Sequence, residues 1–163
     1  MNRVTLFGGL LLAGCGAGSN VDVEAYRAAN REVAASVQLH RDRSRTATTT
    51  QDCADEQRRY DADVRPKVER VRTLSDGMDG CMRSSGRPEW ADMGRMCDSM
   101  MGELDRYGSS ACGSSDQGAN RTDANRHCDV MDGYTARENE RADNAGQCGA
   151  ANGGGMMGGG GMM

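Results

Sequence analysis

The 163-residue chain contains few of the large apolar residues from which protein cores are usually built. It has no isoleucine and a single phenylalanine, and four of its seven leucines fall within residues 6–12. After residue 14 only three leucines and eight valines remain. A content of these residues below about 20 %, combined with high net charge, is typical of disordered chains. Hydrophobic burial alone would therefore scarcely fold this sequence.

The chain also lacks the clustered positive charge that binds nucleic acid. Its formal net charge is −4 at pH 7, Lys67 is its only lysine, and its arginines form no basic run or stripe. Nucleic-acid-binding domains need such a stripe because they neutralise phosphates. We therefore expect no nucleic-acid partner, and no electrostatic patch for a membrane surface.

Motifs of several common enzyme and metal-binding classes do not occur. There is no Gly-x-Ser-x-Gly elbow, no His-Glu-x-x-His pair, no phosphate-binding loop and no Gly-x-Gly-x-x-Gly after a strand. No Cys-x-x-Cys pair exists, which excludes common zinc fingers and covalent haem attachment. Several acidic residues stand among arginines at helical spacing, which indicates solvated faces with ion pairs: Asp61, Asp63, Asp129 and Asp132. We predict that the protein is not an enzyme.

The amino-terminal segment, in contrast, carries a clear pattern. Arg3 precedes an apolar stretch over residues 4–12, which suits the core of a signal peptide. The stretch is too short to cross a bilayer, because a spanning helix needs about 20 apolar residues. It ends in a motif that resembles the lipobox of bacterial lipoproteins, a branched apolar residue and two small residues before a cysteine: Leu12-Ala13-Gly14-Cys15.

The resemblance implies a lipid anchor on Cys15. In lipoproteins this cysteine carries a diacylglycerol thioether, the chain is cleaved before it, and the new amino terminus is acylated, commonly with palmitate. Each buried methylene contributes about 0.8 kcal/mol, so several acyl chains together hold a protein on a membrane. Residues 1–14 would then be the signal peptide and residues 15–20 a tether. The alternative is an ordinary secretory signal with a chance cysteine.

The resemblance also bears on location. Gly16 follows the lipidated position, where an aspartate would retain a lipoprotein in the inner membrane of a diderm bacterium. We therefore expect a lipid-anchored protein of the cell envelope, with the outer membrane favoured if the organism is a diderm, on its periplasmic or surface face. The membrane is the first expected partner.

The remainder of the chain predicts an all-α fold, a small antiparallel bundle of about four helices cross-linked by disulfides. Apolar residues recur at steps of three and four in four segments, residues 21–43, 53–81, 88–107 and 120–142. Short connections make sequence neighbours antiparallel. We predict the bundle over residues 21–148 and a disordered Gly- and Met-rich tail over residues 149–163, since glycine runs lose the most entropy on ordering.

Six cysteines after Cys15 predict a disulfide framework, because exported domains with weak cores depend on such cross-links. In an antiparallel hairpin, two residues lie at one level when their numbers sum to twice the loop centre. This condition pairs Cys53 with Cys112 and Cys97 with Cys128, since both midpoints fall inside predicted loops. Each closed loop should contribute about 3–4 kcal/mol.

The two remaining cysteines, Cys81 and Cys148, would close the other end of the bundle, at levels that match less well. Six cysteines allow 15 pairings, so the assignment rests on this geometry alone. Oxidised cysteines cannot bind metal as thiolates. The disulfide hypothesis and a cysteine-metal hypothesis therefore exclude each other.

Methionine is abundant, with 12 residues, and soft thioethers select Cu(I). Met96 and Met100 share one predicted helix, and His127 and Met131 lie one turn apart on another. These four residues are the candidate ligands of a copper or silver site. The same methionines also fit as flexible filler of a helical core. A non-covalent haem between His127 or His40 and a core methionine is a further alternative.

These patterns favour a membrane-anchored envelope lipoprotein with a non-enzymatic structural or interaction role, without a cofactor and with an envelope protein as a possible partner. The alternative is a protein that binds or buffers soft metals through methionine, histidine and cysteine side chains.

Overall fold

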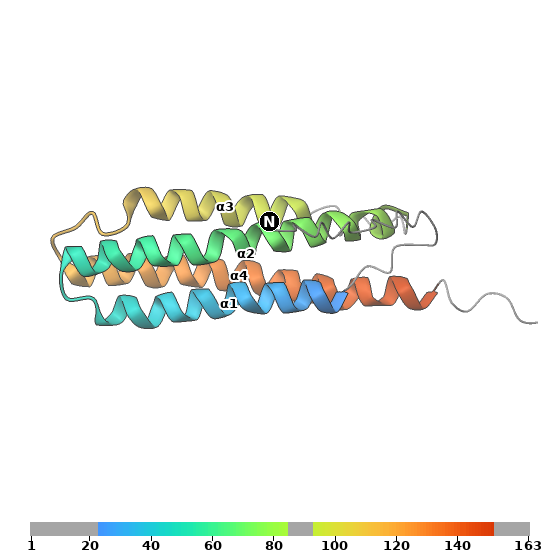
Figure 1. Ribbon diagram of the computed structural model, residues 1–163, viewed down its shortest axis with the longest axis horizontal. Helices are drawn as coiled ribbons and strands as arrows, with labels where there is room; N and C mark the ends of the chain where they lie inside the picture. The colour runs from blue at the N-terminus through green and yellow to red at the C-terminus, as the bar shows by residue number, and fades with distance from the viewer. Residues whose placement is uncertain (1–22, 85–92, 152–163) are drawn as a thin grey trace, which may run out of the picture.

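Four helices form an up-down-up-down bundle in the computed structural model (Figure 1). The structure describes residues 23–84 and 93–151, and it describes side chains at residues 23–76 and 94–143. The helices are α1 (Val23–Thr46), α2 (Thr50–Ser84), α3 (Met93–Ser110) and α4 (Gln117–Ala151). α1 packs against α2 and α4, and α3 closes the bundle against the same two helices. The predicted all-α bundle is confirmed, and these residues contain no strand.

The helix ends differ from the predicted ones where local capping decides them. α2 begins at Thr50 because Thr49 and Asp52 form a capping box. The Asp52 amide donates to Thr49 Oγ1 at 3.0 Å, and the Thr49 amide donates to Asp52 Oδ2 at 3.0 Å. At the other end of the chain α4 runs to Ala151, three residues beyond the predicted end of the bundle at residue 148. Residues 152–163 lie outside the described part.

The interior is thin in apolar residues and uses methionine as filler. α1 and α2 contribute mainly valines, whereas α3 and α4 contribute Met96, Met100, Leu104 and Met131. α2 continues through Pro66 as one helix. Polar residues complete the interior, and the largest of them are His40, His127 and Glu138, each at most 2 % exposed. Each of these buried polar groups needs a hydrogen-bond partner inside the protein.

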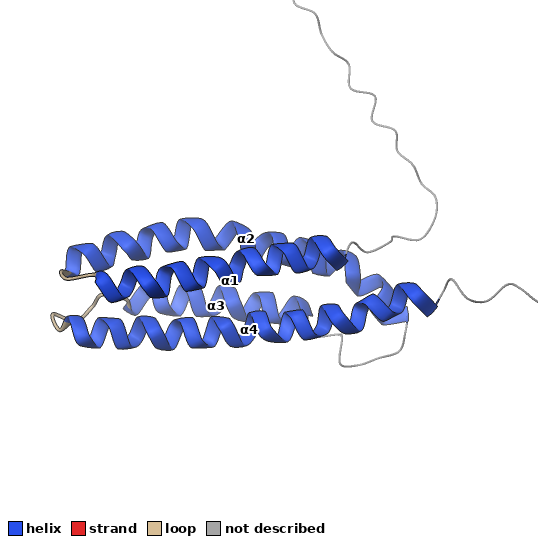
Figure 2. Ribbon diagram, turned by 90° about the horizontal axis from the view of Figure 1, so that it is seen from below, coloured by secondary structure: helices blue, strands red, loops and turns tan. Residues whose placement is uncertain are grey.

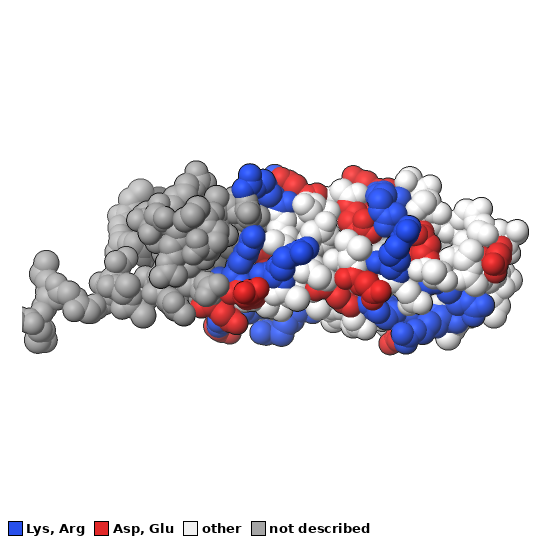
Figure 3. Space-filling model, turned by 180° about the vertical axis from the view of Figure 1, so that it is seen from behind, with Lys and Arg blue, Asp and Glu red and all other residues white. Residues whose placement is uncertain are grey.

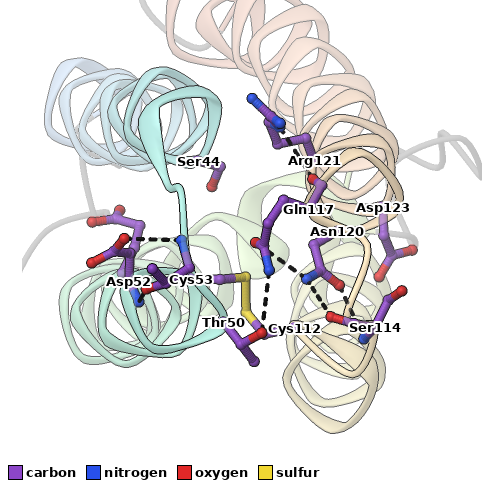
Figure 4. Close-up of a disulfide and its surroundings, with 12 residues drawn as sticks. Ser44, Thr50, Asp52, Cys53, Cys112, Ser114, Gln117, Asn120, Arg121 and Asp123 are labelled. Atoms are coloured by element: carbon purple, nitrogen blue, oxygen red, sulfur yellow. Dashed lines mark hydrogen bonds between the residues drawn. A yellow bond between two sulfur atoms is a disulfide. The ribbon is translucent and has the colours of Figure 1, made fainter.

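One disulfide is present in the described residues, and it joins Cys53 to Cys112, as predicted. Its Cα atoms lie 5.7 Å apart, and it links the start of α2 to the loop after α3 across a sequence separation of 59. Cys112 adopts a φ of 61°, an uncommon conformation for a residue other than glycine. The disulfide therefore secures both described loops at one end of the bundle (Figure 4).

The predicted Cys97–Cys128 disulfide is wrong, because both cysteines are free and fully buried. The α3–α4 loop is asymmetric, so the midpoint of this hairpin lies near residue 117, where Tyr107 stacks on His127, and not at the predicted 112.5. Cys97 consequently lies at the level of Glu138, whereas Cys128 donates to the carbonyl oxygen of Val37 at 3.7 Å. The side chains of the third predicted pair lie outside the described part: Cys81 and Cys148.

Ion pairs connect the helix surfaces. Each of the four aspartates predicted to lie on a solvated face has a basic partner: Asp61 with Arg65, Asp63 with Lys67, and both Asp129 and Asp132 with Arg41. Figure 3 shows charges of both signs interspersed over one face of the bundle. Within the described ranges, no helix combines the length and the apolar character that crossing a bilayer requires.

Candidate functional site

Four aromatic side chains, one from each helix, meet in the interior of the bundle. His40 of α1 stacks on Tyr60 of α2 with ring centroids 4.1 Å apart, and Tyr107 of α3 stacks on His127 of α4 at 4.1 Å. The two stacks meet edge to face, with the imidazole centroids 6.3 Å apart. None of the four side chains is more than 3 % exposed. Together with Glu56 and Glu103, they form what we call the Glu-His-Tyr cluster.

The first half of the cluster is a hydrogen-bonded chain of three residues. Tyr107 donates its phenolic proton to His40 Nε2, with an O···N distance of 3.2 Å. His40 Nδ1 lies 3.3 Å from Glu56 Oε1. A neutral imidazole that carries its proton on Nδ1 satisfies both contacts, because it accepts from the phenol and donates to the carboxylate.

The second half repeats this arrangement. Tyr60 donates to His127 Nε2 at 3.0 Å, and His127 Nδ1 lies 2.9 Å from Glu103 Oε1. Arg106 holds the same carboxylate, with its Nε 2.7 Å from Glu103 Oε2. Both ring nitrogens of both histidines are therefore occupied by side chains of this chain.

The two halves are related by an approximate two-fold symmetry that exchanges α1 with α4 and α2 with α3. Both α2 and α3 supply a glutamate and a tyrosine four residues apart, a spacing that puts both side chains on one helix face. Both α1 and α4 supply a histidine. The underlying pattern is Glu-x-x-Arg-Tyr, which occurs twice: Glu56 to Tyr60 and Glu103 to Tyr107. This repeat was the sequence signal for a site that reasoning from motifs missed.

Burial keeps the imidazoles neutral. It lowers the pKa of His40 to about 3, with the neighbouring His127 acting in the same direction. Burial also lowers the pKa of His127, although Glu103 opposes the shift. The pKa values of Tyr60 and Tyr107 are raised, chiefly by burial, so both phenols keep their protons. All four rings are uncharged at neutral pH.

The two carboxylates differ in their electrostatic surroundings. Burial raises the pKa of Glu56, and Arg43 and Arg59 only partly oppose it. For Glu103 burial acts in the same direction, but the hydrogen bonds from Arg106 and His127 outweigh it and lower the pKa. Glu56 therefore takes up a proton more readily than its counterpart.

A surface hollow of about 360 Å³ between α1 and α2 reaches the first half of the cluster. His40, Glu56 and Tyr60 line it, together with Arg43 and Arg59. Glu56 Oε2 accepts no hydrogen bond from the described residues, since the nearest guanidinium nitrogens lie 3.8 Å and 3.7 Å away. One carboxylate oxygen of the cluster is thus buried beside the hollow without a hydrogen bond, and Arg43 and Arg59 contact it only as ion pairs.

The structure buries all four residues of the predicted soft-metal site, Met96, Met100, His127 and Met131. The three methionines belong to the apolar core, and His127 has no ring nitrogen left for a metal. His40 is engaged in the same way, so neither histidine is free for a haem. The described residues also contain no group of three or more His, Cys, Asp or Glu side chains that could hold a metal ion. Cys15, the predicted lipidation site, lies outside the described part.

A second buried polar pair lies between the cluster and the amino-terminal end of α1. Tyr26 donates to Glu138 Oε2, and both side chains are fully buried. Burial raises the pKa of Glu138 to about 7, against the effects of Tyr26 and two arginines. This carboxyl group therefore titrates near neutral pH.

Comparison with models of protein families, with curated proteins and with solved structures finds no significant match to this chain. What the protein does must be inferred from its own residues.

Proposed function

We propose that the protein is a lipid-anchored lipoprotein of the bacterial cell envelope with a non-enzymatic structural or interaction role. The lipobox-like motif ending in Cys15 motivates the anchor. The observation that carries the proposal is the Cys53–Cys112 disulfide, because disulfides persist in oxidising compartments and are rare in the cytosol. A disulfide in a chain with a signal-peptide pattern fits the periplasmic or external side of a membrane.

With a lipid on Cys15, the arrangement of the bundle would direct one end away from the membrane. α1 begins at Val23, eight residues after Cys15, and both described loops lie at the opposite end (Figure 2). At 1.5 Å per residue, the 24 residues of α1 extend about 36 Å. We therefore propose that the end that carries the disulfide is the membrane-distal end.

The membrane-distal end is polar and held in place by local hydrogen bonds (Figure 4). Gln117 donates to Thr50 Oγ1 at 3.2 Å across the two loops, and Asn120 donates to the carbonyl oxygen of Ser114 at 2.9 Å. Among the described residues, Leu39 is the most exposed large apolar side chain, at 46 %. A partner at this end would be bound through polar and ionic contacts, which favour specificity and association rate.

The anchor can be tested by expressing the full-length chain in a diderm host supplied with labelled palmitate. We expect label on the protein, a mature amino terminus at Cys15 by mass spectrometry, and accumulation of the precursor when signal peptidase II is inhibited. Cys15→Ser should abolish the label and the cleavage, so that the precursor accumulates with or without the inhibitor. The matched control is the double variant Cys53→Ser/Cys112→Ser, which should keep the label. A mature chain that begins elsewhere, with an unmodified thiol at Cys15, would refute the proposal.

A further inference from the structure

We propose that Tyr107 is a site of reversible one-electron oxidation, with its proton passing through His40 to Glu56 at the surface hollow. This activity goes beyond the anchoring role and does not depend on it. The electron acceptor is an outer-sphere one-electron oxidant, which need not touch the buried ring. Three residues form a continuous hydrogen-bonded path from the interior to the lining of the hollow: Tyr107, His40 and Glu56.

The step balances within the path. Tyr107 loses one electron to the oxidant, which is reduced by one electron, and its phenolic proton moves to His40 Nε2 across 3.2 Å. The proton on His40 Nδ1 moves to Glu56 Oε1 across 3.3 Å. The products are a neutral tyrosyl radical, a neutral imidazole protonated on Nε2, and an uncharged Glu56. Return of an electron reverses each transfer.

The interior makes the proton path necessary. A phenol that loses only an electron becomes a cation, and a buried charge without compensation is costly. A neutral imidazole at hydrogen-bond distance accepts the proton as the charge develops. Tyr107 is 2 % exposed and stacked on His127, so its radical is shielded from reaction with a second molecule.

The two halves of the cluster are not equivalent, and their difference singles out Tyr107. Tyr60 also donates to an imidazole, but the carboxylate behind that imidazole is Glu103, held as an anion by Arg106. Glu56 faces the hollow and has an oxygen without a hydrogen-bond partner among the described residues. The arginines beside Glu56 lie beyond hydrogen-bond distance, at 3.7 Å and 3.8 Å, so a proton that arrives there breaks no hydrogen bond to an arginine. A proton on Glu103 would have to displace the hydrogen-bonded Arg106.

The inference can be tested by flash photo-oxidation of the full-length protein in detergent, with a ruthenium tris-bipyridine sensitiser and persulfate. Electron paramagnetic resonance should detect a long-lived tyrosyl radical. Tyr107→Phe should remove most of this signal, and the matched variant Tyr60→Phe should keep it. Glu56→Gln preserves the hydrogen bond from His40 but takes up no proton, so radical formation should slow by about 100-fold, the lower range for a positioned base. Glu103→Gln should leave the rate unchanged.

A role of these residues in folding alone predicts a different outcome. The melting temperature of each variant shows whether it is folded, and a second measurement needs no substitution: in D₂O the wild-type radical should form more slowly, because protons move with the electron. Equal loss of signal in Tyr107→Phe and Tyr60→Phe, a rate independent of D₂O, or a radical located on Tyr26, Tyr134 or Trp90 would each overturn the inference. Because lipid plays no part in the assay, failure here leaves the anchoring proposal intact.

Discussion

Replacing both Cys53 and Cys112 with alanine is expected to lower the free energy of unfolding by about 4 kcal/mol. The disulfide closes a loop across a sequence separation of 59. In the chain-entropy treatment, a cross-link over about 60 residues removes roughly 14 cal/mol/K from the unfolded ensemble, which gives this value at 25 °C. Natural domains of this size are stable by only about 5–15 kcal/mol, so the disulfide supplies a large share.

Urea unfolding followed by circular dichroism measures this change. With reductant in both samples, the wild-type protein should unfold at the same midpoint as the double variant. The double variant should show a larger dependence on urea than the oxidised wild type because its unfolded state is more extended. If the double variant and the oxidised wild type have the same free energy of unfolding, the entropic reasoning fails.

The same experiment examines the third predicted cysteine pair. Cys97 and Cys128 are free, so among the described residues the double variant contains no disulfide that reductant could break. A further loss of stability on adding reductant would therefore reveal the Cys81–Cys148 bond. An unchanged midpoint would indicate that these two cysteines are not joined.

Three other predictions follow from single contacts. The wild type should lose stability as the pH rises from about 4.5 to about 7, because burial raises the pKa of Glu138 and the folded state retains a proton that the unfolded state releases. Glu138→Gln should abolish this loss. Urea titrations at several pH values check this, and a wild type with no slope in that range would contradict it. Thr49→Ala should destabilise the protein by about 1 kcal/mol through loss of the α2 cap, measured against the exposed control Ser109→Ala. Dialysis against Cu(I) should leave no stoichiometric copper on the protein, because both ring nitrogens of His127 are engaged. Copper that is retained, and is lost when Met96, Met100 and Met131 are replaced by leucine, would instead favour the soft-metal hypothesis.

The helices could be predicted because their signal is local. Valines, methionines and leucines recur at helical steps in all four segments, and this periodicity determines which face is buried. Most described boundaries lie within five residues of the predicted ones, but α4 ends at Ala151, nine residues beyond the predicted end at 142. Helix ends are harder to predict than helix faces, since a capping contact such as that of Thr49 with Asp52 extends or ends a helix independently of the apolar pattern.

The disulfide assignment shows how far spacing alone reaches. Cys53 and Cys112 pair as predicted because α2 and α3 meet at nearly the assumed level: the ion pairs Arg65–Asp105 and Arg72–Asp98 both have their midpoint at residue 85, close to the assumed 82.5. The same condition is wrong for Cys97 and Cys128 because α3 and α4 meet with their midpoint near residue 117, outside the centre of the loop that joins them. Sequence numbers carry no information about such an offset.

The amino-acid sequence by itself determined that this protein is helical, poor in core-forming residues, and in need of support beyond apolar burial. Only the tertiary structure decided that part of this support is a buried polar cluster. Its histidines lie 87 residues apart and each half joins three helices, so no local pattern could bring them together. The residue types specify which hydrogen bonds are possible, and the packing of four helices selects those that form.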